Sequence, residues 1–202
     1  MAKHASLPQF YDAYDFYRQT IIEPLVLRQK AARSYGFTYS DLVSSDDWEI
    51  FCAILLDRDS PGGSSGADLI GVEVKSSKDR NSFEYQYHRD HGLTKLYDDA
   101  HIHHAYVSYA AGYDDITIRL VRSEKIHDSI RAWRPGYIET YSGPNPRDRY
   151  RPNISYGFVN KNGIALMEIR GGKIEQVTTA TLSELLSPPL PCHLPGCLAD
   201  KK

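Results

Sequence analysis

The feature that most restricts the fold of this chain is a change of hydrophobic period at the segment SPGGSSG, residues 60–66. Before this segment, apolar residues recur at the 3.6-residue spacing of an amphipathic helix. After it, apolar and polar residues alternate, as they do in half-buried strands. A cluster of Gly, Ser and Pro ends a regular element. The order of patterns predicts an α/β (α+β) domain, in which helices flank a mixed central β-sheet.

A first helix is expected over residues 8–35, which show the helical spacing. Pro24 is expected to kink or split this helix, because proline has no N–H to donate and its ring clashes with the preceding turn. Gly36 is expected to close it, since glycine is common just after a helix. The apolar stripe of this helix consists of Phe10, Tyr14, Tyr17, Ile21, Leu25 and Ala32.

A second helix is expected to start at Ser45 or Asp46 and to run through DWEIFCAILL. Asp46 followed by Glu49 has the spacing of a capping box, which marks the beginning of a helix. The predicted buried face of this helix consists of Trp48, Phe51, Cys52, Leu55 and Leu56.

The second part of the chain contains four strand-like runs rich in Val, Ile, Tyr and Phe. Helices are expected at residues 92–100 and 123–133 between or after these runs. Residues 134–152 are rich in Pro and Gly, so a loop is expected there. A late hairpin is expected around Lys161-Asn162-Gly163, between SYGFVN and GIALMEI. The four strand-like runs are LIGVEVKSS, NSFEYQYH, HAYVSYA and ITIRLV.

The length of 202 residues suits one domain, expected over residues 1–186 and followed by a Pro-rich tail at 187–202. A net charge of −2 and a pI near 6.4 exclude a uniformly basic nucleic-acid-binding protein. The N-terminus lacks the apolar segment of a signal peptide, and no window approaches the length of a membrane span. Three cysteines without an export signal suggest reduced thiols. We therefore expect a cytoplasmic protein that does not enter a membrane.

Charged residues occur within one of the strand-like runs, SSGADLIGVEVKSS. In a strand, Glu73 and Lys75 point to the same face, about 6 to 7 Å apart along the chain. Asp68 lies an odd number of residues before Glu73, so a flat strand would send it to the opposite face. Gly71 permits a bulge or tight turn that would bring it back. Ionisable groups are costly to bury unless they face one another or a shared ligand.

Two carboxylates beside an amine suit Mg²⁺, which prefers hard oxygen ligands and is often completed by waters and a substrate phosphate. Such a set fits phosphodiester hydrolysis, with Mn²⁺ able to substitute. Lys75 could then orient or deprotonate the attacking water, or stabilise the negative charge of the transition state. An exposed Glu73–Lys75 ion pair on a strand is the alternative interpretation.

Asp68 and Glu73-Val74-Lys75 together resemble the Asp…(Asp/Glu)-x-Lys signature of the PD-(D/E)xK nuclease superfamily, although Ala67 stands where that family has proline. GADLIGVEVKSS followed by NSFEYQYHRD is similar to the PvuII-like type II restriction endonucleases. The resemblance covers residues 66–125. It implies a restriction-endonuclease-like core, with catalysis and DNA readout within residues 45–133.

The resemblance also leaves two assignments open. The gap between Asp68 and Glu73 is shorter than usual in the family, so Asp57 or Asp59 could be the first carboxylate instead. In several nucleases of the superfamily a glutamate on the helix before the motif faces the site as an outer metal contact. Glu49 occupies such a position, with the capping box as its alternative role.

A polar strand follows the motif. In NSFEYQYH the alternation places Phe83, Tyr85 and Tyr87 on one face and polar residues on the other. Gln can pair with adenine, Glu can accept from the cytosine amino group, and His or Ser can contact several acceptors. A solvated strand face over an aromatic core is the alternative. The residues predicted to contact DNA are Ser76, Lys78, Asn81, Ser82, Glu84, Gln86, His88 and Arg89.

Further basic residues flank this strand. Arg80, His91 and Lys95 could hold phosphates, which set the register of a protein on DNA and supply salt-dependent affinity. The segment RDRYR, residues 147–151, could contact the DNA backbone or a groove, or could be a charged surface loop. HIHH, residues 101–104, invites a metal interpretation but has no partner cluster in the sequence.

Together these features predict a Mg²⁺-dependent, sequence-specific endonuclease that cuts double-stranded DNA, with Asp68 and Glu73 as metal ligands. Such an enzyme is expected to be a homodimer matched to a palindromic site, with residues 1–36 as the dimer surface. A cognate DNA methyltransferase is implied by the resemblance. The alternatives are a PD-(D/E)xK nuclease for repair or mobile-element processing, and a non-catalytic DNA-binding module of the same fold.

Overall fold

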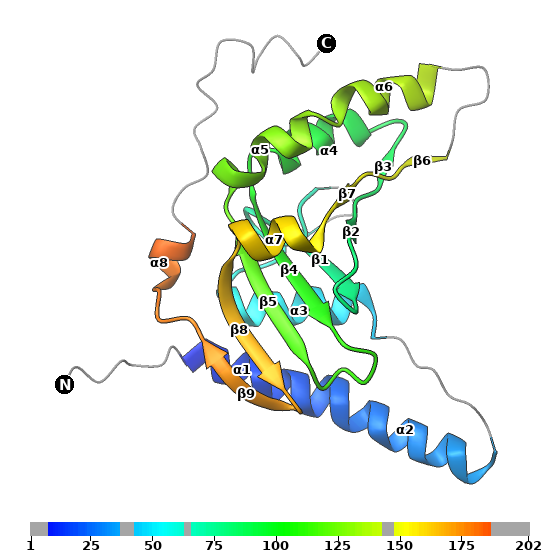
Figure 1. The fold of residues 1–202 in the computed structure, drawn as a ribbon, viewed down its shortest axis with the longest axis vertical. Coiled ribbons are helices and arrows are strands. Elements are labelled where there is room, and N and C mark those ends of the chain that lie inside the picture. Colours follow the sequence, from blue (N-terminus) through cyan, green and yellow to red (C-terminus); the bar gives the residue numbers. More distant parts are fainter. Residues whose placement is uncertain (1–7, 37–42, 63–65, 143–147, 187–202) are drawn as a thin grey trace.

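A five-stranded mixed sheet forms the centre of the protein (Figure 1), which is described by a computed structural model over residues 8–36, 43–62, 66–142 and 148–186. The strands follow the order β1-β4-β5-β8-β9. β1 and β4 are parallel, and the remaining three neighbouring pairs of this sheet are antiparallel. The predicted mixed α/β architecture is therefore confirmed. The strands are β1 (Val72–Lys78), β4 (His103–Tyr109), β5 (Ile116–Val121), β8 (Ile164–Arg170) and β9 (Lys173–Val177).

Helices from the N-terminal part of the chain cover one face of this sheet. α1 packs on α3, and α3 packs on β1. The buried face predicted for the second helix is confirmed, because all five of its residues belong to the hydrophobic core under the sheet. Gly36 closes the first helical segment with a φ of +74°, as expected. The helices are α1 (Pro8–Phe16), the π-helix η1 (Tyr17–Ile22), α2 (Glu23–Ser34) and α3 (Ser45–Leu56).

The predicted break in the first helix lies before Pro24 rather than at it. The backbone changes to a π-helix over Tyr17–Ile22, and Pro24 then falls in the first turn of α2. A proline is tolerated there because the first N–H groups of a helix have no intrahelical partner.

The capping box predicted at Asp46 and Glu49 is wrong, because α3 is capped by another pair. Ser44 is the N-cap, and its side chain accepts from the Asp47 N–H while Asp47 accepts from the Ser44 N–H. The pair Asp46 and Glu49 is shifted by two residues from this box. Glu49 is therefore not a capping residue.

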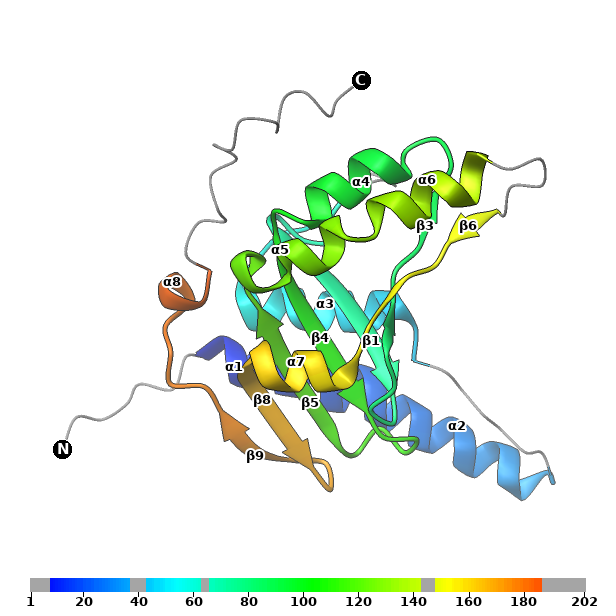
Figure 2. The same cartoon turned by 45° about the horizontal axis from the view of Figure 1, so that its top comes forward.

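A second aromatic core covers the opposite face of the sheet, where Tyr106 of β4 faces away from its neighbours Ala105 and Val107. Helices from the middle of the chain lie over this core (Figure 2). Two of them confirm the helices predicted at residues 92–100 and 123–133. These helices are α4 (Gly92–Asp99), α5 (Ser123–Arg131), α6 (Arg134–Ser142) and α7 (Tyr156–Asn162).

The loop predicted at residues 134–152 is wrong for its first half, which forms α6. Pro and Gly occur only in the first turn of this helix, where proline is tolerated. Tyr137 and Tyr141, four residues apart, pack edge to face at 4.9 Å and attach the helix to the second core. The rest of that region contributes the short strand β6 (Arg149–Tyr150).

The predicted late hairpin is also wrong. Ser155 caps α7 by accepting from the Phe158 N–H at 3.1 Å, so SYGFVN is helical rather than extended. The hairpin instead joins β8 and β9, and Gly171 and Gly172 turn it with φ values of +53° and +71°. The chain then continues to the short helix α8 (Leu182–Leu185).

The run NSFEYQYH forms two short strands that pair outside the main sheet. β2 (Phe83–Glu84) pairs with β7 (Asn153–Ile154), and β3 (Tyr87–His88) pairs with β6. The Tyr85 N–H also donates to the Pro152 carbonyl at 2.9 Å. Residues 83–88 and 149–154 thus form a two-stranded antiparallel ribbon, which we call the polar ribbon.

Within the described ranges, no helix is long and apolar enough to cross a bilayer. The tail expected at residues 187–202 lies outside the described residues.

Candidate active site and nucleic-acid interface

A tight turn brings Asp68 back to strand β1. Leu69 and Val72 exchange two backbone hydrogen bonds, of 2.9 and 3.0 Å, across Ile70 and Gly71. Gly71 has a φ of +77°, a backbone conformation that residues other than glycine rarely adopt. The carboxylate of Asp68 then accepts from the Val74 N–H at 2.8 Å. The role predicted for Gly71 is confirmed, since Asp68 lies against the strand that carries Glu73.

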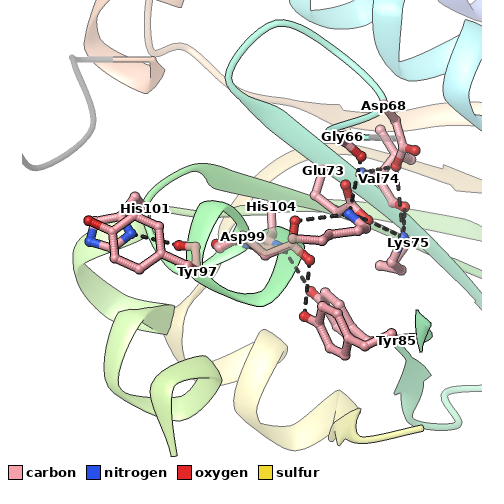
Figure 3. A network of polar contacts seen from close by, with 12 residues as sticks. Gly66, Asp68, Glu73, Val74, Lys75, Tyr85, Tyr97, Asp99, His101 and His104 are labelled. Atoms are coloured by element: carbon pink, nitrogen blue, oxygen red, sulfur yellow. Dashed lines mark hydrogen bonds and ion pairs between the residues drawn. The ribbon is translucent and has the colours of Figure 1, made fainter. Parts of the chain in front are cut away.

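The ammonium of Lys75 lies among three oxygen atoms (Figure 3). Its Nζ is 2.6 Å from Glu73 Oε1, 3.0 Å from the Val74 carbonyl oxygen and 3.8 Å from Asp68 Oδ2. The Glu73 side chain is 1% exposed and that of Lys75 is 21% exposed. Asp68, Glu73 and Lys75 therefore converge, and the interpretation of Glu73–Lys75 as an exposed ion pair is wrong.

Lys95 and Asp99 of α4 complete the ionic cluster, which the sequence did not predict. Lys95 Nζ lies 2.9 Å from Glu73 Oε1, 2.9 Å from Asp99 Oδ1 and 3.2 Å from the Gly66 carbonyl oxygen. A phosphate contact stays a prediction for Lys95, and in this structure its ammonium is an internal ion-pair partner. Its spacing of four residues from Asp99 on a predicted helix is the signal that could have indicated the pair.

A buried chain of hydrogen bonds continues from Asp99 into the second core. Burial lowers the pKa of His104 to about 4, so its ring is neutral. Its Nε2 lies 2.7 Å from the Asp99 carbonyl, which can only accept, so Nε2 carries the proton and Nδ1 accepts from the Tyr85 hydroxyl at 2.7 Å. Tyr106 then donates to Tyr85. His104 of the HIHH segment is therefore a structural residue rather than a metal ligand.

The charges of the cluster determine which roles are open to Lys75. Burial alone would lower the pKa of Lys75, but the neighbouring Glu73 and Asp68 carboxylates raise it above its usual value. Lys75 is thus an ammonium at physiological pH. It can donate hydrogen bonds and stabilise negative charge, and this state argues against its role as the base that deprotonates a water.

The acidic members of the cluster differ in their tendency to ionise. Burial would raise the pKa of Glu73, yet the two ammonium groups of Lys75 and Lys95 hold it below its usual value. Burial raises the pKa of Asp68 above its ordinary value and the pKa of Asp99 to about 7. The negative charge of Glu73 raises both pKa values further. Glu73 is therefore the carboxylate most strongly held in its charged form.

Glu49 belongs to the electrostatic surroundings of this cluster. Its pKa is raised, first by burial and then by the negative charge of Asp68, with smaller contributions from Asp46 and Glu73. Glu49 lies on α3, which packs against β1, and it plays no part in the capping box. A contact with an outer metal shell remains a prediction for this residue.

Asp68, rather than Asp57 or Asp59, is the first carboxylate of the cluster in this structure. Asp57 is the left-handed C-cap of α3, with a φ of 49°, and its side chain is exposed. Asp59 is also exposed, and its backbone carbonyl accepts from the Ile70 N–H at 2.9 Å. Only Asp68 of these three residues contacts Lys75.

The oxygen atoms around Lys75 have the chemistry of a Mg²⁺ site. Asp68 and Glu73 supply carboxylates and Val74 supplies a carbonyl, which are hard ligands. Glu73 Oε2 is buried and has no hydrogen-bond partner within the described part of the chain. That same part contains no group of three or more His, Cys, Asp or Glu side chains spaced for a metal ion. Two carboxylates nevertheless fit Mg²⁺, because this ion commonly keeps waters and takes substrate phosphates as further ligands.

The polar ribbon presents an exposed polar face over a buried aromatic one. Phe83, Tyr85 and Tyr87 are buried, which confirms the predicted alternation, while Ser82, Glu84, Gln86 and His88 are exposed. Of the remaining predicted DNA contacts, Lys78 is exposed at the end of β1, Asn81 is exposed in the turn that follows, Arg89 is exposed after β3, and Ser76 is half-buried.

The second strand of the ribbon adds arginines to this face. Glu84 accepts from Gln86 Nε2 at 2.8 Å and from Arg151 Nη1 at 3.3 Å, and Gln86 accepts from Arg149. The RDRYR segment was expected either to contact DNA or to form a surface loop. Residues 149–151 lie along the predicted readout strand rather than in a separate loop, so Arg149 and Arg151 share the surface of Gln86 and Glu84. Contact with DNA stays a prediction for this segment.

Comparison of the sequence with protein-family models and with curated proteins finds no match. A functional assignment therefore depends on the geometry of the cluster and on the resemblance of the motif.

Proposed function

We propose that the protein is a Mg²⁺-dependent, sequence-specific endonuclease that cuts double-stranded DNA, of the type II restriction kind within the PD-(D/E)xK superfamily. One observation supports this proposal above the others. The turn at Gly71 brings Asp68 to Glu73 and Lys75, and Glu73 Oε2 is left buried without a hydrogen-bond partner in the described structure. A buried oxygen of this kind costs free energy unless it coordinates a cation or accepts a hydrogen bond.

The three residues of the motif and Glu49 each have a defined role in the proposed hydrolysis. A bound Mg²⁺ would polarise the scissile phosphate and lower the pKa of a water molecule. Asp68 and Glu73 would hold that ion, and Glu49 would contact its outer shell. Lys75, as an ammonium, would donate to the phosphate oxygen on which negative charge develops.

The polar ribbon is the proposed DNA-reading surface. The major groove of B-DNA admits a two-stranded β-ribbon, whose outward side chains can then reach base edges. Glu84, Gln86 and His88 lie on the exposed face of one strand, and we add Arg149 and Arg151 from the other, because arginine commonly pairs with guanine. Lys78 at the end of β1 and Arg89 just after β3 would hold phosphates on either side of the ribbon strand.

A homodimer is part of the proposal, because two active sites are needed to cut both strands of a palindromic site. Most of the apolar stripe of α1 and η1 is already buried within the chain. α2 extends away from the sheet (Figure 1), and its Val26 and Leu27 are 55% and 67% exposed. We propose α2 as the dimer contact, in a cytoplasmic enzyme accompanied by a cognate methyltransferase.

Light scattering tests the dimer. We expect a mass of twice 22.9 kDa for the purified chain. Replacing Leu27 with glutamate should shift the mass to that of the monomer, because a charge would have to be buried at the contact. Replacing the exposed Lys30 of the same helix with glutamine, which also lowers the net charge by one, serves as the charge-matched control. A monomeric wild-type protein, or a dimer unaffected by Leu27→Glu, would contradict the α2 contact.

Plasmid digestion with and without Mg²⁺ tests the proposed activity. We expect discrete fragments with Mg²⁺ or Mn²⁺, none with a chelator, and DNA binding without cleavage in Ca²⁺. A smear or nicking without defined fragments would favour a repair or mobile-element nuclease. Binding without any cleavage would favour the non-catalytic DNA-binding module, and full activity in the presence of chelator would remove the metal from the mechanism.

Substitutions on the polar ribbon separate base contacts from phosphate contacts. Gln86→Ala and His88→Ala should each cost about 1 to 3 kcal/mol of affinity for the cognate site while non-specific binding persists. Arg89→Ala should instead weaken binding to all sequences alike and reduce its salt dependence. Affinity for cognate and scrambled duplexes at two salt concentrations is the measurement. Equal losses for both duplexes in Gln86→Ala and His88→Ala would show that this strand holds only the DNA backbone.

A further inference from the structure

Lys95 connects three segments of the chain at the edge of the proposed metal site. An ammonium group has three N–H donors, and Lys95 has three acceptors within hydrogen-bond distance. These are Gly66 in the segment before β1, Glu73 on β1 and Asp99 on its own helix. Glu73 and Asp99 are each only 1% exposed, so Lys95 bridges two buried carboxylates.

The two oxygens of Glu73 are used very unequally. Oε1 accepts from both Lys75 and Lys95, whereas Oε2 has no partner among the described residues. Two positive charges within 2.9 Å of the same carboxylate oppose the approach of a divalent ion. The Lys95 ammonium therefore repels a metal ion at Glu73 and weakens its binding, unless the ammonium moves to another anionic partner.

A pocket beside Lys95 offers such a place. It has a volume of about 410 Å³ and is lined by Gly66, by Gln86 and His88 of the polar ribbon, and by residues of α4 and its N-terminal approach. Lys95 itself lines this pocket, and its side chain is 25% exposed. The pocket thus lies beside the proposed DNA-reading surface, and the ammonium that contacts Glu73 is also part of its lining.

We propose that Lys95 couples DNA binding to metal binding. In the free protein it neutralises Glu73 and keeps a divalent ion from binding tightly. When DNA binds, Lys95 turns to a phosphate in the pocket, and Glu73 becomes available to the ion. This inference rests on the proposed nuclease function and assigns Lys95 and Asp99 as positioning residues of that site. By linkage, the metal must strengthen DNA binding by the same factor as DNA strengthens metal binding.

The affinity of the full-length protein for Mn²⁺ tests this coupling, measured by electron paramagnetic resonance at mildly alkaline pH. The titrations are made with and without a short random-sequence duplex that carries phosphorothioate linkages to resist cleavage. For wild type we expect the affinity to rise about tenfold or more when the duplex is present. Lys95→Met should bind Mn²⁺ about tenfold more tightly than wild type without DNA and should lose most of the DNA effect.

Asp99→Asn should shift the affinity in the opposite direction. It removes the carboxylate charge that Lys95 shares with Glu73 and leaves Glu73 as the one charged partner of Lys95 among the described residues, so Mn²⁺ should bind more weakly than to wild type without DNA. A merely structural role of the pair would move both variants in the same direction. Changes of opposite sign in Mn²⁺ affinity therefore identify the electrostatic role. If circular dichroism shows that Lys95→Met does not fold, Asp99→Asn alone still tests that role. Lys173→Met, on an exposed lysine of β9, is the control and should match wild type.

Glu73→Gln separates failure of this inference from failure of the proposed function. If wild type binds Mn²⁺ and Glu73→Gln abolishes the binding, the metal site stands. An unchanged or lowered affinity in Lys95→Met, or a raised one in Asp99→Asn, then overturns the coupling alone. If Mn²⁺ does not bind wild type even with DNA, or binds Glu73→Gln equally well, both the coupling and the metal-dependent nuclease are overturned.

Discussion

Replacing Lys75 with alanine is expected to lower the rate of DNA cleavage by about two to three orders of magnitude, the usual effect of removing one preorganised donor from a transition state. The ammonium lies within 4 Å of both proposed metal-binding carboxylates, and these carboxylates raise its pKa. It is therefore positively charged where negative charge would develop on the phosphate. Specific DNA affinity should change far less, because the bases are read by the polar ribbon.

Single-turnover cleavage and equilibrium DNA binding, measured on the same preparation, test this expectation. Lys173→Ala is a matched control, since that lysine is exposed on β9 at the far edge of the sheet. Lys75→Arg is informative as well, because it keeps the charge but not the compact shape of the ammonium. Normal cleavage by Lys75→Ala would show that Glu73 and Lys75 are only a buried ion pair.

Replacing Phe83 with alanine is expected to lower the free energy of unfolding by about 3 to 5 kcal/mol, the usual range for a buried phenylalanine. Phe83 is fully buried, and its ring centroid lies 4.7 Å from that of Tyr106 on the main sheet. It therefore attaches the polar ribbon to the second core. The loss arises because the cavity cannot close fully around rigid neighbouring rings.

Urea denaturation of the two proteins measures this difference. Ser82→Ala is the control, because Ser82 is the exposed neighbour of Phe83. Its backbone carbonyl accepts from the Ser77 hydroxyl at 3.0 Å, and its own hydroxyl has no hydrogen bond to the residues that the structure describes. It should change the free energy of unfolding by less than about 0.5 kcal/mol, as is usual for surface substitutions. If Phe83→Ala costs no more than the control, the ribbon is not anchored by this ring.

The ionic motif could be predicted from the sequence because its parts are local. Asp68, Glu73 and Lys75 lie within eight residues of one another, and the turn that Gly71 makes between them is local too. Period-two alternation was enough to place Glu73 and Lys75 on one face of the strand, and to place Phe83, Tyr85 and Tyr87 on the buried face of the ribbon.

The remainder of the site depends on contacts between distant segments. Lys95 reaches Glu73 across 22 residues, and Arg149 reaches Gln86 across 63. A single sequence shows neither pairing, because its periodicity describes each element and not its neighbour. The charge of Lys95 suggested a phosphate contact but gave no indication of its three acceptors within the protein.

The errors in secondary structure have a common cause. Pro135 and Gly136 suggested a loop, although both fall in the first turn of a helix whose later tyrosines are held by the second core. Likewise, Asp46 and Glu49 suggested a capping box that Ser44 and Asp47 in fact form. In both cases a local signal fits two structures, because proline occurs in loops and in the first turn of a helix, and two pairs with the spacing of a capping box lie two residues apart.

Sequencing the DNA ends after digestion of a long, mixed-sequence DNA with Mg²⁺ is the most direct measurement of the proposed activity. We expect the ends to share one short, two-fold symmetric sequence, and we expect no new ends with chelator or with Glu73→Gln. Uncut DNA under all metal conditions, or the same ends from wild type and Glu73→Gln, would contradict the assignment of Asp68, Glu73 and Lys75 as a nuclease site.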